Sequence, residues 1–203
     1  IPQFALVREA TVALALPAVE LAGFEADDLI ATYAAVAEDA GLATTIVSSD
    51  KDLMQLVRGD ITMLDPMKQR RIGAAEVVDR FGVPPAQVVD VQALAGDATD
   101  NVPGVPGIGI KTAAELINTY GDLDTLLARA GEIKQPKRRE NLLQFAEQAR
   151  ISRQLVLLRD DAPMPLDLDA LKMPARDRGK LISFLQQQEF KRLLVRLGAN
   201  GAA

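Results

Sequence analysis

The residues best suited to chemistry in this chain of 203 residues are carboxylates, gathered in three short stretches. The seven acids are Glu25, Asp27, Asp28, Asp50, Asp52, Asp97 and Asp100. Carboxylates that converge in a fold repel one another, and an all-oxygen cluster is usually neutralised by Mg²⁺ or Mn²⁺. We therefore expect the three stretches to meet in a site for divalent cations.

A glycine-rich segment follows the third acidic stretch directly. It contains Gly104, Gly107 and Gly109 and ends in Lys111 and Thr112. Glycines let a backbone approach a ligand closely, and the free amides at the start of a helix attract anions. A simple turn between two helices would explain the same glycines. Beside a metal site, a phosphate-binding turn points to chemistry on a nucleic-acid backbone.

Composition removes several other kinds of site. The chain has no cysteine and no histidine, so disulfides, thiolate metal sites and histidine zinc sites are excluded. Catalysis would have to use carboxylates, lysine, tyrosine, hydroxyl groups or metal-activated water. No stretch is long enough to span a bilayer and no signal-peptide pattern is present, so we expect no membrane partner.

The net charge of −5 does not argue against a nucleic-acid partner. Without the seven cluster acids, 21 acidic residues remain against 23 basic ones. Basic residues also gather in two stretches, around Arg70 and around Lys137 and Arg138. Each stretch could be a solvated loop, but the second is a candidate for phosphate contact.

The first third of the chain predicts an α/β fold. Apolar spacing indicates strands over residues 19–22, 44–47 and 61–64 and helices over 3–16, 26–40 and 51–57. This alternation predicts a parallel sheet covered by helices, whose ligands gather beyond the carboxyl ends of the strands. Glu25 and Asp50 would each follow a strand, so their carboxylates would share one sheet edge.

The rest of the chain predicts helices only. We expect them over residues 74–81, 85–94, 112–120, 123–130, 138–149 and 174–197, with a loop at 160–165. Two regions follow: residues 1–73, part of an α/β catalytic domain, and residues 74–203, a helical region. The helical region would contain a helix–hairpin–helix motif at about 94–120.

Local structure alone offers another explanation for each acidic stretch. Glu25, Asp27 and Asp28 could cap a helix or oppose its dipole, and Asp50 and Asp52 could do the same. Asp97 and Asp100 could be turn formers. Three such stretches at one sheet edge favour the metal site.

Three segments also resemble motifs of a known family. Residues 24–30, 48–56 and 94–113, with their acidic stretches and the glycine-rich turn, resemble the 5′ nuclease (flap endonuclease) family. The form they resemble stands at the start of bacterial DNA polymerase I. In that family a strand with a metal-binding aspartate and a basic arch precede the first of these motifs. We therefore expect the sheet here to be incomplete, without its first strand.

The resemblance implies two Mg²⁺ or Mn²⁺ sites and hydrolysis of a phosphodiester by metal-activated water. Glu25, Asp27 and Asp28 would serve the first site, and the other four acids chiefly the second. The hairpin, with Lys137 and Arg138, would bind duplex DNA without reading its sequence. It could also hold a K⁺ ion on backbone carbonyls.

The resemblance also implies partners and setting. The substrate would be nicked, flapped or 5′-ended duplex DNA, including RNA primers, in replication and repair. We expect a monomer fused to polymerase domains in the bacterial cytoplasm, associated with the nucleoid. Two alternatives stay open: a non-catalytic DNA-binding fragment that keeps the helix–hairpin–helix, and a metal-dependent RNase with the same kind of sheet.

Overall fold

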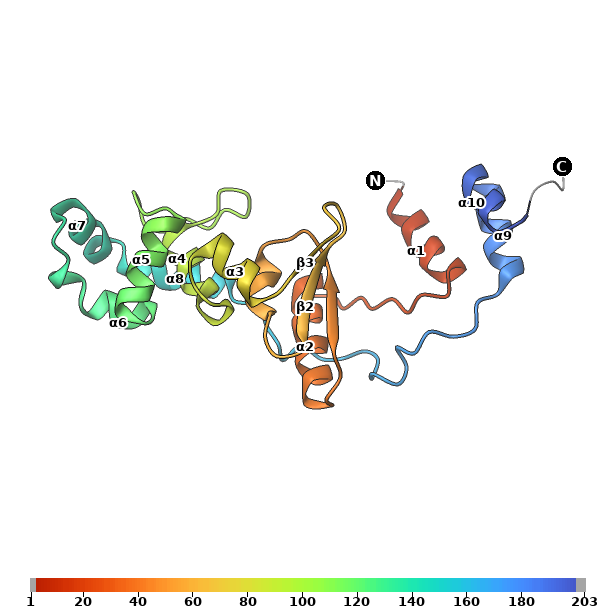
Figure 1. The fold of residues 1–203 in the computed structure, drawn as a ribbon, viewed down its shortest axis with the longest axis horizontal. Helices are drawn as coiled ribbons and strands as arrows, with labels where there is room; N and C mark the ends of the chain where they lie inside the picture. Colours follow the sequence, from red (N-terminus) through yellow and green to blue (C-terminus); the bar gives the residue numbers. More distant parts are fainter. Residues whose placement is uncertain (1–2, 200–203) are drawn as a thin grey trace. The chain divides into compact units, whose positions relative to one another are not determined.

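The computed structural model describes residues 3–199, and these fall into two compact units. One unit comprises residues 24–162, and the other combines the described residues up to and including Gly23 with those from Pro163 onward. Figure 1 shows the larger unit as a small sheet joined to a group of helices.

The larger unit begins with the sheet region. Its elements are α2 (Ala26–Asp39), β1 (Thr44–Val47), the 3₁₀ helix η1 (Asp52–Leu56), β2 (Ile61–Asp65) and β3 (Arg70–Ile72). Strands β1 and β2 are parallel, with Thr44 opposite Ile61, and β3 runs antiparallel to β2. Helix α2 packs on β1 and η1. The predicted α/β class is confirmed, although the sheet is mixed.

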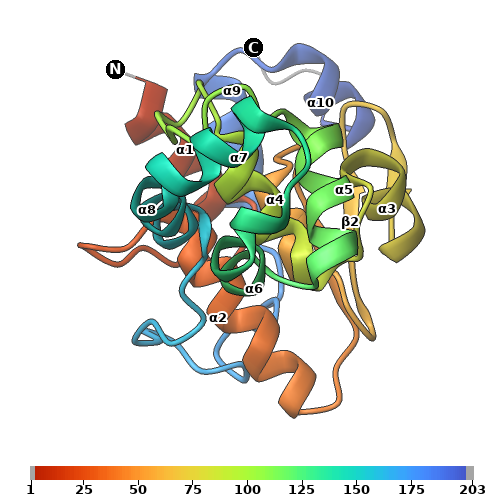
Figure 2. The same ribbon diagram turned by 90° about the vertical axis from the view of Figure 1, so that its left-hand side faces the viewer.

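Helices and short 3₁₀ turns make up the remainder of this unit. They are α3 (Ala74–Phe81), η2 (Pro85–Gln87), α4 (Val88–Ala95), α5 (Ile110–Tyr120), α6 (Leu123–Ala128), η3 (Ala130–Glu132), α7 (Pro136–Gln144) and α8 (Ala146–Val156). Helix α4 packs against both α5 and α8, and Figure 2 shows α4 beside α5. Every residue of α4 except its last is buried, because neighbours cover it on several sides.

One hydrophobic core joins the sheet to the helices of the larger unit. Leu53 and Met63 from the sheet region belong to the same buried cluster as Leu94 and Ile117 from α4 and α5. This continuity matters for the site, because the core holds the end of β1 and the end of α4 against each other.

The smaller unit contains α1 (Gln3–Ala13), α9 (Arg178–Gln187) and α10 (Lys191–Arg196). Ala13, Leu181 and Leu185 form its buried centre. No helix among residues 3–199 is both long enough and apolar enough to cross a bilayer.

The strand predicted over residues 19–22 is wrong. Those residues are irregular, and no strand among the described residues pairs with them. An isolated extended segment gains no ladder hydrogen bonds, so it has no reason to be a strand. The carboxylate of Glu20 instead accepts hydrogen bonds of 2.7 and 2.9 Å from Arg8. Glu25 therefore does not follow a strand, whereas Asp50 does.

Several other predicted boundaries change. The helix predicted at 51–57 is a 3₁₀ helix, and the one at 138–149 divides at Phe145, whose backbone leaves the helical region. The helical segment predicted at 174–197 contains two helices, α9 and α10, which begin at Arg178 and Lys191. Strand β3 was missed because its sequence, Arg-Arg-Ile, lacks an apolar alternation. The predicted loop at 160–165 is confirmed.

Candidate metal and nucleic-acid site

The second acidic stretch lies in the turn that leaves β1. The Asp50 amide donates to Ser48 Oγ at 3.0 Å, and the Asp52 amide donates to Asp50 Oδ1 at 3.0 Å. The side chains of Ser48 and Asp50 thus stabilise the turn by accepting backbone amides two residues further on, which is common for Ser and Asp. Asp50 is exposed and Asp52, the first residue of η1, is half-buried.

The third acidic stretch lies in a closed loop after α4. Asp97 and Val102 exchange two backbone hydrogen bonds of 2.8 Å, which bring the ends of the loop together. The Thr99 amide donates to Asp97 Oδ1 at 2.9 Å. Within this loop Asp97 is buried, with 8% of its surface exposed, and Asp100 is exposed.

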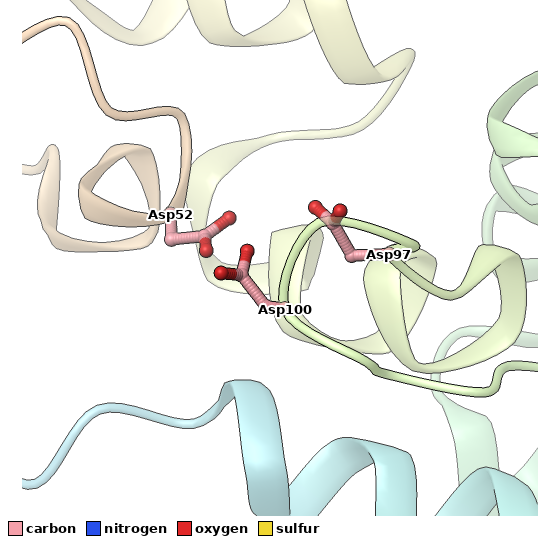
Figure 3. A group of neighbouring side chains, drawn as sticks. All are labelled: Asp52, Asp97 and Asp100. Carbon is pink, nitrogen blue, oxygen red and sulfur yellow. The ribbon is translucent and has the colours of Figure 1, made fainter.

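These two stretches meet in the folded chain. One carboxylate oxygen each from Asp52, Asp97 and Asp100 lies within 4.8 Å of the others. Figure 3 shows Asp97 and Asp100 on one loop and Asp52 on a separate segment, with the carboxylates of Asp52 and Asp100 turned toward each other. This arrangement can hold a metal ion, and its oxygen-only donors suit a hard divalent cation.

Two further side chains set the electrostatics of this cluster. Lys51 forms an ion pair with Asp97, which lowers the pKa of Asp97 and raises the pKa of Lys51. Gln92 Nε2 donates to Asp52 Oδ1 at 2.5 Å. Burial raises the pKa of Asp52, the hydrogen bond from Gln92 opposes this, and the charge of Asp50 adds to the rise.

The sequence suggested a role for Lys51 but not for Gln92. Lys51 stands between two predicted ligands, where it could orient a carboxylate or simply be exposed. Gln92 was missed, because an amide within an apolar helix gives no sign of its partner. Its Oε1 atom is buried and has no hydrogen-bond partner among the described residues.

Asp27 is the residue of the first acidic stretch whose pKa responds to the second stretch. Burial raises the pKa of Asp27, and the negative charges of Asp50 and Asp52 raise it further. A carboxylate feels such repulsion only from charges close by, so Asp27 belongs to the electrostatic neighbourhood of the cluster. Glu25 is exposed just before α2.

Asp28 has a structural task that the capping alternative anticipated. Its carboxylate accepts the Glu25 amide at 3.2 Å and the Arg159 amide at 3.0 Å. The second bond joins positions 131 residues apart. Asp28 therefore holds the start of α2 to the segment that follows α8.

The glycine-rich segment combines a buried part with an exposed part. Gly104 is buried at φ +61°, where a Cβ atom would lie 2.4 Å from the Gly96 nitrogen. Its amide donates to Ser152 Oγ at 3.1 Å and its carbonyl accepts from Gln148 at 2.7 Å. The backbone polar groups of Gly104 are thus bonded within the protein.

The second half of the segment faces solvent. Gly107, Gly109 and Lys111 are exposed and Thr112 is half-buried. Gly109 precedes α5 in extended conformation, so the free amides of the first turn of α5 begin here. The segment offers exposed backbone and one cation at a helix start.

Helix α7 is fastened to this segment. Asn141 Nδ2 donates to the Pro106 carbonyl at 2.7 Å. Lys137 and Arg138 lie on the same helix, and Lys137 pairs with Glu140 at 3.0 Å on an exposed face. The sequence did not reveal Asn141 or Gln148 as the anchors of the turn, because both are ordinary polar residues of helices.

The chain matches two protein-family models in the same order as these features. Residues 1–82 match the model of the 5'-3' exonuclease N-terminal resolvase-like domain, and residues 83–179 match that of the 5'-3' exonuclease C-terminal SAM fold. The chain belongs to the 5'-3' exonuclease family. It is 58% identical to DNA polymerase I of Rhizobium leguminosarum over 197 residues, which is 97% of this chain and 19% of that protein. The chain thus spans about a fifth of that relative.

Solved structures share the fold. The bacteriophage T5 5'-exonuclease with bound zinc ions has a TM-score of 0.66 at 23% identity, covering 84% of this chain and 62% of that one. The T5 flap endonuclease in complex with DNA and metal ions has a TM-score of 0.66 at 22% identity, covering 92% and 66%. At these identities the likeness supports the architecture of this exonuclease-family chain.

Proposed function

We propose that the chain is a 5′→3′ exonuclease and flap endonuclease domain that depends on divalent metal ions. It hydrolyses phosphodiesters near the 5′ ends of nicked or branched DNA and removes RNA primers. The observation that carries this proposal is the convergence of Asp52, Asp97 and Asp100 within 4.8 Å. Family membership and the order of the motifs support it.

In this proposal the seven predicted acids share the binding of Mg²⁺ or Mn²⁺. Asp52, Asp97 and Asp100 hold one ion, aided by Asp50, and Asp27 and Glu25 extend the site toward a second. When bound, such ions activate a water nucleophile and neutralise the charge of the phosphodiester. Asp28 stays in the predicted set, although both its oxygens accept backbone amides.

Two residues of the chain prepare the carboxylates. Lys51 compensates the charge of the buried Asp97, and Gln92 fixes the orientation of Asp52 by donating to one oxygen. The other oxygen of Asp52 is left for a cation. Partners of this kind orient metal ligands in many proteins.

The helix–hairpin–helix would hold the duplex near the cut. We propose backbone contacts from Gly107 and Gly109, with Lys111 and Thr112 at the start of α5 and Lys137 and Arg138 on α7. Gly104 would shape the turn, since its amide and carbonyl are bonded internally. Non-sequence-specific binding is expected of phosphate contacts. A K⁺ ion at this turn remains a prediction.

The cellular role of the chain is proposed from the names of its relatives. Their name, DNA polymerase I, supports a role in bacterial replication and repair within a longer protein. The monomeric state, the association with the nucleoid and the division between residues 1–73 and 74–203 remain predictions.

Metal binding and cleavage test the proposal together. Mn²⁺ binding to the chain would be measured by calorimetry, and cleavage of a labelled 5′-flap duplex would be measured with Mg²⁺. Asp100→Asn removes one carboxylate of the cluster, and Asp60→Asn serves as the matched control on an exposed loop. We expect Asp100→Asn to weaken Mn²⁺ binding and cleavage and Asp60→Asn to change neither.

The outcomes separate the alternatives. A parent chain that binds the flap duplex but cleaves nothing in Mg²⁺ or Mn²⁺ would support the non-catalytic DNA-binding fragment. Preferential cleavage of RNA would support the RNase. Equal Mn²⁺ affinity in the parent chain and Asp100→Asn would refute the metal cluster.

A further inference from the structure

Arg80 is an exposed cation beside the carboxylate site that the proposed function has not used. It lies in the last turn of α3, and Phe81 beside it is buried in the core. Its guanidinium carbon lies 6.0 Å from the centre of the Phe81 ring. Arg80 forms no ion pair with any residue from 3 to 199.

Arg80 lines three neighbouring cavities. One of about 430 Å³ is also lined by Asp50, Lys51 and Asp100, so it opens onto the carboxylate cluster. A second of about 520 Å³ is lined by Ile110 and Lys111 at the start of α5. Arg80 therefore stands between the carboxylates and the exposed end of the glycine-rich segment.

The third cavity, of about 260 Å³, brings Arg80 together with Lys68 and Arg70 of the β2–β3 hairpin. Neither Lys68 nor Arg70 is ion-paired within residues 3–199. These three cations thus line one cavity, although the pKa of Glu76 is lowered by hydrogen bonds from backbone amides and also by the charge of Arg70.

The acids that line the third cavity are mostly engaged with backbone. Asp65 accepts the amides of Met67 and Lys68 at 2.9 and 3.1 Å, and Glu76 accepts the Gly73 amide at 2.8 Å. Asp79 is the remaining acid of the cavity. Three cations and three acids therefore line this cavity. Two of the acids already accept backbone amides, so the cations, which have no ion-pair partner among residues 3–199, are the groups available to donate to phosphate oxygens.

We propose that Arg80, with Lys68 and Arg70, forms a phosphate-binding surface for one strand of the nucleic acid. The strand would run from the carboxylate cluster past Arg80 to Lys111. A guanidinium presents two parallel donors to phosphate oxygens, which suits it to this task. The inference rests on the proposed function, because it assigns contacts to the same substrate.

The test is the salt dependence of DNA binding by the intact chain. A flap duplex labelled at a 3′ end would be titrated by fluorescence anisotropy over a NaCl series, with Ca²⁺ to suppress cleavage. The variants are Arg80→Gln and Arg80→Lys. The control is Arg129→Gln, which removes an arginine that pairs with Glu132 and lines none of the three cavities.

Loss of one neutralised phosphate should reduce the slope of log K against log salt by about 0.9 in Arg80→Gln. Arg80→Lys should restore the slope because the charge returns, and Arg129→Gln should match the parent chain. Mn²⁺ affinity without DNA should not fall in any variant, since Arg80 donates nothing to a cation.

Two results would overturn the inference. If the parent chain binds and cleaves the flap duplex but Arg80→Gln has the parent slope, the arginine serves only the end of α3 and the proposed function stands. If the parent chain binds neither Mn²⁺ nor DNA, the inference fails together with the proposed function.

Discussion

Alanine substitution along the glycine-rich segment should separate its structural part from its binding part. In Gly104→Ala the new Cβ would lie 2.4 Å from the Gly96 nitrogen and 2.7 Å from the Gly96 Cα. Both neighbours are backbone atoms, so neither can rotate away. The backbone at Gly104 also has φ +61°, which is unfavourable for alanine.

The expected destabilisation follows from three contributions. The left-handed conformation costs alanine about 1–2 kcal/mol, and forcing an extra carbon into packed backbone costs about 1–3 kcal/mol more. The lower entropy of the unfolded alanine chain offsets about 0.4–1 kcal/mol of this. Gly104→Ala should therefore lower the free energy of unfolding by about 1–5 kcal/mol.

Two neighbouring glycines provide matched controls. Gly107 has φ +78°, but a Cβ there would meet only Asn141 Nδ2 at 3.7 Å. Gly107→Ala should cost about 1 kcal/mol, from conformation alone. Gly109 has φ −99° and no atom within 4 Å of a Cβ. Gly109→Ala should stay within about 0.5 kcal/mol of the parent chain.

Urea unfolding followed by tyrosine fluorescence is the assay. The chain has two tyrosines and no tryptophan, and Tyr33 and Tyr120 both lie in the unit formed by residues 24–162. The signal therefore reports on the unit that contains the segment. Equal midpoints for Gly104→Ala and Gly109→Ala, with equal slopes, would refute the argument from close packing.

Three further predictions concern the carboxylates and the hairpin. Burial raises the pKa of Asp27 in the folded state, so the free energy of unfolding falls as the pH rises through that pKa. In EDTA at pH 7, Asp27→Asn should therefore have a higher urea midpoint than the parent chain. This gain should vanish at pH values below the ordinary aspartate pKa range. Gln92→Leu removes the donor to Asp52 and should weaken Mn²⁺ binding by about tenfold in calorimetry; unchanged affinity would show that Gln92 does not orient Asp52. Lys111→Ala should reduce the salt slope of duplex binding by about 0.9 in anisotropy while Mn²⁺ affinity stays unchanged; a parent slope would make the exposed turn a structural element only.

Local features were well determined by the sequence. Helix α2 ends shortly before Gly41, which has φ +71°, and the positive φ values of Gly104 and Gly107 agree with the need for glycine in such turns. The acidic residues and their spacing marked Asp52, Asp97 and Asp100 as members of one site before any contact was known. These features depend on neighbours in sequence, and residue types record them directly.

The tertiary structure decided which acids meet and what restrains them. The turn after β1 and the loop after α4 lie side by side because Leu53 and Leu94 belong to one core, and this proximity sets Lys51 against Asp97 and Gln92 against Asp52. The packing of the chain also places the Arg159 amide where it donates a hydrogen bond to Asp28, and no local sequence pattern could reveal this partner. Residue types show what a side chain can bind, but partners 40 to 131 residues away are chosen only when the chain packs.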